Sequence, residues 1–143
     1  MVAAMRNLAS DALLLTGRLL IGALFVPAGI STLSNIAGST GYFAGLGMPL
    51  PMLAAWGVGL FELLAGVLVV LGWQTKPASL ALAGFCIAAA FIGHSGQGGD
   101  DAALRFMHEQ AFYKDIAIAG GLLFLAAAGA GVWSVDRRLM RIS

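Results

Sequence analysis

The sequence predicts an all-α membrane protein, an antiparallel bundle of four transmembrane helices. Hydrophobic residues make up 59% of the chain and charged residues only 10%, whereas about a quarter of the residues in a soluble domain are charged. The apolar residues gather in four runs that are long enough to cross a bilayer, at about residues 12–33, 52–71, 78–94 and 115–135. The polar segments between them are too short for a soluble catalytic domain, so we expect residues 1–143 to form a single membrane domain.

The net charge and the cysteine and histidine content exclude several classes of partner and site. A net charge of +1 provides no broad basic surface, so nucleic acid is not an expected partner. The single cysteine, Cys86, lies inside the third apolar run, which excludes an intrachain disulfide and a CxxC dithiol. The two histidines form no recognisable zinc or haem motif, so no metal site is expected, although an axial haem histidine remains an open alternative.

The first apolar run contains one charged residue, Arg18. Arg18 shares a helical stripe with Gly22, Phe25 and Gly29. The hydrophobic region of a signal peptide is not normally interrupted by an arginine, so we expect a retained membrane helix. After it, the composition changes to Gly, Ser, Thr and Asn, and residues 41–49 are expected to form a turn on the membrane surface.

The second run has Glu62 as its one ionisable group, near the middle of the span. An ionised carboxylate at that depth costs about 2.5 to 3.5 kcal/mol, so such a residue usually faces a partner or a wet cavity, or stays protonated. Glu62 lies on one stripe with Ala55, Gly59 and Gly66, whose small side chains allow another helix to approach or leave a pocket. Two interpretations remain open: a functional carboxyl group, or a protonated acid hydrogen-bonded to a neighbouring helix.

The most polar part of the chain follows the third run, which ends at His94. We expect a flexible glycine-rich stretch at residues 95–101 and a separate short interfacial helix at residues 102–114. Lys114 and Asp115, at the start of the fourth run, are most simply a pair at the membrane interface.

The distribution of lysine and arginine predicts the orientation. If both termini lie on one side of the membrane, six of the eight basic residues lie on or near that side. These are Arg6, Arg18, Lys76, Arg137, Arg138 and Arg141, against Arg105 and Lys114 on the other side. The N- and C-termini are therefore expected in the cytoplasm. In this topology Glu62 leans toward the end that carries His94 and Lys114, which disfavours a direct pair with Arg18.

Motifs along most of the chain, in this order, carry a resemblance to a known family. They are Arg18-Leu19-Leu20-Ile21-Gly22, Gly47-Met48-Pro49, Gly59-Leu60-Phe61-Glu62-Leu63-Leu64-Ala65-Gly66, His94, Phe112-Tyr113-Lys114-Asp115 and Asp136. Their order and spacing resemble the DoxX family of small bacterial membrane proteins. The family takes its name from the association of similar proteins with a thiosulfate:quinone oxidoreductase.

The resemblance implies a multi-pass protein of the bacterial inner membrane. It further implies an accessory subunit of a membrane redox system, non-catalytic rather than an enzyme by itself, that binds a quinone or a lipid through Glu62, Arg18, His94 and Lys114. The partners implied are membrane lipids, a quinone, subunits of a redox complex and further copies of the chain.

Two other functions remain open. One is a structural or assembly factor that binds another membrane protein through its small-residue helix faces. The other is a carrier of a small solute or of protons, for which a single four-helix unit would have to form an oligomer.

Overall fold

The computed structural model of the protein describes residues 2–140, with side chains from Leu8 onward. Four of its helices are long and apolar enough to cross a membrane, and the described part of the chain contains no strand. The prediction of an all-α membrane protein with four spans is therefore confirmed. The elements are α1 (Val2–Ser34), α2 (Ile36–Gly45), α3 (Pro51–Leu71), α4 (Thr75–Ala89) with the π-helical turn η1 (Ala90–His94) that continues it, α5 (Ala102–Ala128) and the short α6 (Val135–Leu139).

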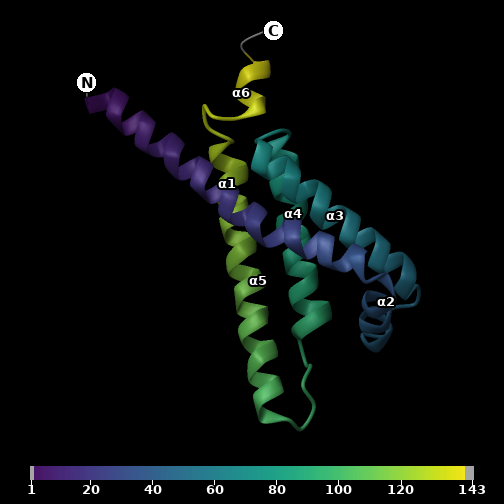
Figure 1. The fold of residues 1–143 in the computed structure, drawn as a ribbon. Coiled ribbons are helices and arrows are strands. Elements are labelled where there is room, and N and C mark those ends of the chain that lie inside the picture. Colours follow the sequence, from purple (N-terminus) through teal and green to yellow (C-terminus); the bar gives the residue numbers. More distant parts are fainter. Residues whose placement is uncertain (1, 141–143) are drawn as a thin grey trace.

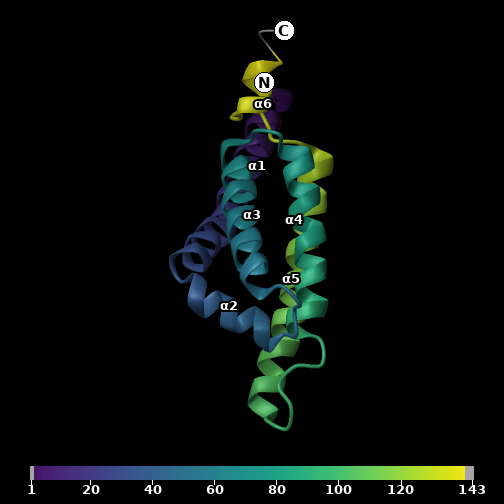
Figure 2. The ribbon, with the colours of Figure 1, turned by 90° about the vertical axis from the view of Figure 1, so that its right-hand side faces the viewer.

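The long helices form two pairs (Figures 1 and 2). Helix α1 packs along α3, and α4 packs along α5. The chain enters α1 and leaves α6 at the end of the molecule where α3 connects to α4, and α2 lies toward the opposite end. The four long helices therefore alternate in direction, which confirms the antiparallel bundle. The cytoplasmic location of the termini stays a prediction, and two residues of its charge count, the Arg6 side chain and Arg141, lie outside the described residues.

Glycines bring α1 and α3 close together. Gly22 and Gly29 of α1 and Gly59 and Gly66 of α3 are all buried. A Cβ atom at Gly29 would lie 2.5 Å from the backbone nitrogen of Leu63 and 2.7 Å from the carbonyl oxygen of Gly59. Only a residue without a side chain fits there, so the expected small-residue stripes do face protein.

Two segments are more helical than the sequence predicts. Helix α1 already begins at Val2, about ten residues before the expected span, because the tail has neither glycine nor proline and is rich in good helix formers. Helix α2 replaces much of the expected surface turn. The side chain of Asn35 caps it by accepting a hydrogen bond of 3.1 Å from the Gly38 N–H.

The expected boundary at residue 115 is absent. Residues 102–114 continue directly into the span as part of α5, whose first turn is capped by the Asp101 carboxylate. The same helix ends at Ala128, seven residues before the predicted limit of residue 135. Gly129 and Gly131 have φ angles of 81° and 78°, in the region that favours glycine, and end the helix there.

Arg18 and Asp136 form hydrogen bonds that connect distant chain segments at the end of the bundle that carries α6. The buried Arg18 guanidinium donates hydrogen bonds to the carbonyl oxygens of Val70 (3.1 Å) and Trp133 (2.5 Å). The Asp136 carboxylate accepts hydrogen bonds from the N–H groups of Gln74 (2.8 Å) and Thr75 (3.0 Å), at the start of α4. The segment after α5 is thereby held against the α3–α4 connection.

Candidate functional site

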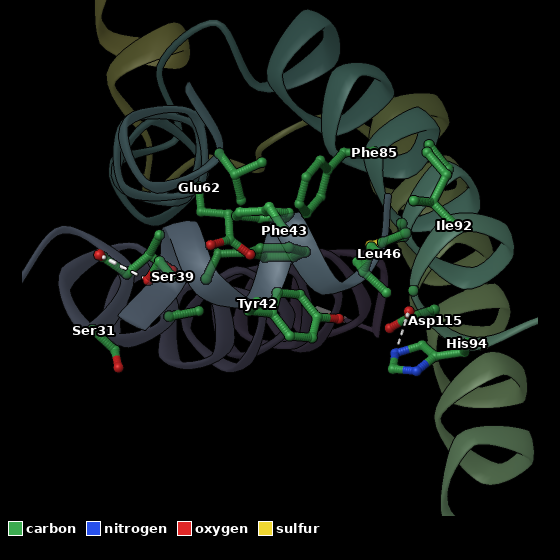
Figure 3. Close-up of a pocket in the computed structure, with 18 of the residues that line it drawn as sticks. Ser31, Ser39, Tyr42, Phe43, Leu46, Glu62, Phe85, Ile92, His94 and Asp115 are labelled. Carbon is green, nitrogen blue, oxygen red and sulfur yellow. Dashed lines mark hydrogen bonds and ion pairs between the residues drawn. The ribbon is translucent and has the colours of Figure 1, made fainter. Parts of the chain in front are cut away.

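A cavity of about 730 Å³ lies between the two helix pairs, toward the end that carries α2 (Figure 3). Residues of α1, α2, α3, α4, η1 and α5 line it, and most of the lining is apolar. The large apolar side chains of the lining include Phe25, Phe43, Val58, Phe85, Ile92 and Ile118. Both the volume and this lining are typical of pockets that hold small organic ligands.

Glu62 supplies a carboxyl group to this cavity from the middle of α3. Its side chain is half-buried and points into the cavity (Figure 3). Within residues 8–140, no group donates a hydrogen bond to the Glu62 carboxyl group and no cation pairs with it. This arrangement differs from the one expected of an acid that only joins two helices.

His94 lies in the same cavity, at its η1 end. The wide turn of η1 closes with a hydrogen bond of 3.1 Å from the Ser95 N–H to the Ala90 carbonyl oxygen. His94 ends this turn and faces α5, where its Nε2 lies 3.6 Å from Asp115 Oδ2 and its Nδ1 lies 3.0 Å from His108 Nδ1. Single π-helical turns are often found at functional sites.

Asp115, rather than its neighbour Lys114, lines the cavity. His108, Asp115 and Leu122 recur every seven residues and share one face of α5. Leu122 is fully buried, so this face of the helix points into the bundle. Lys114 lies about 100° away around the helix and is exposed.

Tyr42 reaches the same end of the cavity from α2. Its hydroxyl oxygen lies 3.3 Å from the position that a Cβ atom would take at Gly93, next to His94. Burial and, to a smaller extent, the Asp115 carboxylate raise the pKa of the Tyr42 phenol above its ordinary value. Tyr42 therefore keeps its proton at neutral pH and can donate a hydrogen bond there.

The four site residues expected from the sequence fall into two groups. Glu62 and His94 lie in one cavity, as the helix geometry suggested. Arg18 lies at the other end of the bundle, where two backbone carbonyls bind it, and Lys114 lies on the exterior of α5. Sequence reasoning missed Tyr42 as a lining residue and read Asp115 as part of an interface pair. The seven-residue spacing of His108, Asp115 and Leu122 was the signal that could have found Asp115.

Taken together, these features describe a multi-pass membrane protein with a largely apolar cavity whose lining includes two carboxyl groups. The DoxX family model matches residues 13–95, more than half of the chain. The chain belongs to the DoxX family. The matched region includes Glu62 and His94, whereas His108 and Asp115 lie beyond it.

Two relatives from Escherichia coli K12 cover nearly the whole chain. The chain is 35% identical to the inner membrane protein YphA over 132 residues, which are 91% of this chain and 92% of YphA. It is 35% identical to the inner membrane protein YqjF over 129 residues, 90% of this chain and 93% of YqjF. With the four apolar helices, these similarities identify a multi-pass protein of the inner membrane.

A more distant relative is an uncharacterized membrane protein of Mycobacterium tuberculosis. It is 31% identical over 137 residues, 87% of this chain and 79% of that protein. No solved structure shows significant similarity to this chain.

Proposed function

We propose that this protein binds a quinone or a lipid of similar shape in the cavity and serves as a non-catalytic subunit of a membrane redox system. The observation that carries the binding proposal is the Glu62 carboxyl group, which faces a largely apolar cavity of about 730 Å³ without a partner among residues 8–140. A partly buried carboxyl group with no partner is costly, and a ligand that hydrogen-bonds to it reduces that cost.

The polar groups of the cavity fit a neutral headgroup. Glu62 lies in one part of the lining and the His94–Asp115 pair in another, with Phe25, Phe43 and Phe85 among the apolar side chains of the same cavity. A quinone ring carries carbonyl oxygens on opposite sides and can accept a hydrogen bond at each of them. Protonated Glu62, the His94 N–H and the Tyr42 hydroxyl are suitable donors.

An anionic phospholipid headgroup fits less well. Its phosphate would enter a cavity that already holds the carboxyl groups of Glu62 and Asp115. The Arg18 guanidinium, which could neutralise a phosphate, is hydrogen-bonded to backbone carbonyls at the other end of the bundle. Like charges in a medium of low dielectric repel strongly. Charge therefore favours a quinone over an anionic lipid, and the redox role agrees with the oxidoreductase link of the DoxX family.

If the protein is instead an assembly factor, it cannot bind its partner through the small-residue stripes of the first two spans. The glycines of those stripes are already buried within the chain. A partner helix could approach the glycines of the spanning helices that have open space around them, which are Gly17, Gly57, Gly84, Gly120 and Gly121.

Native mass spectrometry of the detergent-purified protein tests the proposed function. We expect the wild-type protein to retain a small molecule with the mass of the host quinone. Glu62→Gln should lower that occupancy by up to about tenfold, the size expected when one buried hydrogen bond is weakened. Glu109→Gln, a matched change on the exposed surface of α5, should leave it unchanged. A retained partner chain without any small molecule would favour the assembly factor.

A further inference from the structure

A row of three side chains from η1 and α5 reaches the cavity at the end of the bundle where these two elements are connected. The Nδ1 atoms of His108 and His94 lie 3.0 Å apart, and His94 Nε2 lies 3.6 Å from Asp115 Oδ2. His94 and Asp115 line the cavity, whereas His108 does not. We propose that His108, His94 and Asp115 form a proton relay between water at this end of the bundle and the cavity.

The contact between the histidines fixes how they share protons. Two protonated Nδ1 atoms cannot face each other at 3.0 Å, so one ring must donate and the other accept. The Asp115 carboxylate favours a proton on His94 Nε2, which leaves His94 Nδ1 as the acceptor. His108 is then the donor through its Nδ1–H.

A proton can move along this row without a change in the total charge of either ring. His94 passes its Nε2 proton to Asp115, takes the Nδ1 proton of His108, and His108 takes one proton from water at Nε2. One proton leaves water and one appears on Asp115, while both rings end in the opposite tautomer. The 3.6 Å between His94 Nε2 and Asp115 Oδ2 exceeds a hydrogen bond, so the transfer from His94 to Asp115 needs Asp115 to move closer or one water to bridge the two atoms.

The neighbouring ionisable groups indicate where the proton goes next. Lys114 and His94 both act electrostatically on Asp115, and Tyr42 faces the same site from α2 but retains its proton. Across the cavity lies Glu62, the second carboxyl group. The identity of the final proton acceptor rests on the proposed function. A quinone takes up protons when it is reduced, whereas a phospholipid does not.

Time-resolved infrared spectroscopy after a pH jump tests the relay in the purified full-length protein, without added quinone. The carboxylic acid band of Asp115 is assigned by its loss in Asp115→Asn. We expect His94→Gln and His108→Gln to slow the rise of this band by about tenfold or more, since each interrupts the row. Glu109→Gln, next to His108 in sequence but outside the row, should leave the rate unchanged.

A wild-type rate in both histidine variants would overturn the relay, because Asp115 would then exchange protons directly with water. If His94→Gln does not fold, His108→Gln decides alone, since His108 lies outside the cavity. The band kinetics do not depend on quinone content. A working relay in a protein that retains no quinone would therefore refute the proposed function alone, and a quinone-bound protein with unaltered rates would refute the relay alone.

Discussion

Asp136 stabilises a helix that begins more than sixty residues before it in the sequence. Its carboxylate accepts hydrogen bonds from the N–H groups of Gln74 and Thr75, which have no acceptor within α4 itself. Burial opposes its ionisation, but these hydrogen bonds and the nearby Arg18 guanidinium outweigh burial and lower the pKa of Asp136 below its ordinary value. A carboxyl group whose pKa falls on folding stabilises the fold above its unfolded pKa, and that stabilisation is lost as the pH falls through the folded pKa.

We therefore expect Asp136→Asn to destabilise the protein at pH 7 by about 1 kcal/mol, the usual value of a helix cap that is partly screened by solvent. The difference from wild type should shrink as the pH falls from about 4 through the lowered pKa. Thermal unfolding in detergent at a series of pH values measures it, with the exposed Asp100→Asn as the control. A difference that stays constant from pH 7 to pH 3 would show that the charge of Asp136 is not what stabilises α4.

Only part of the candidate site could be predicted residue by residue. Glu62 and His94 stand out because one is an acid at mid-span and the other ends an apolar run. His108 and Asp115 were assigned to different elements, since the sequence placed a helix boundary at residue 115 where α5 is continuous. The position of Arg18 depends on the carbonyl of Trp133, 115 residues away, and no local pattern contains such a contact.

At the scale of the elements, the α1–α3 pair is the tightest contact in the bundle. Without hydrophobic driving force inside a bilayer, helix pairs depend on close van der Waals packing, which small residues allow. Gly29 lies where the α3 backbone approaches most closely, so an added methyl group there meets backbone atoms that cannot move aside.

Gly29→Ala should destabilise the protein by about 1 to 3 kcal/mol or more through overpacking. Gly57→Ala is the matched control in α3, because a Cβ atom there meets nothing within 4 Å. That control should be neutral or stabilise by up to about 1 kcal/mol through its better helix propensity. Thermal unfolding in detergent compares the two variants, and equal melting temperatures would refute the close α1–α3 contact.

The long apolar elements were predictable and the connections between them were less so. Four spans follow from apolar runs of sufficient length, which is a local property of the sequence. Helix α2 was missed because its glycines suggested a turn, although Asn35 supplies a cap and α3 supplies a surface for packing. The end of α5 was placed too late because apolar residues continue beyond Gly129 and Gly131, whose backbone conformation no longer allows a helix.

At the scale of the whole molecule, the bundle has two ends of different charge. We predict that the end carrying the termini faces the cytoplasm, because six of the eight basic residues lie on or near that side. A cysteine at Asp100 should then react with an impermeant thiol reagent in intact cells, and one at Met140 should not. Both positions are exposed, while the native Cys86 is buried and should not react. The opposite labelling pattern would reverse the orientation.

The cavity depends on both helix pairs, since α3 carries Glu62 while η1 and α5 carry His94 and Asp115. A ligand that contacts both sides couples these residues, and coupling is measurable as a departure from additivity.

The most direct measurement is quinone occupancy by native mass spectrometry for Glu62→Gln, His94→Gln and the double variant, each checked for a retained fold. If both residues bind one ligand, each single variant should lose occupancy and the double variant should lose no more than the more affected single variant. Additive losses would mean that the two residues do not share a ligand. Wild-type occupancy in all three variants would contradict the proposed binding site.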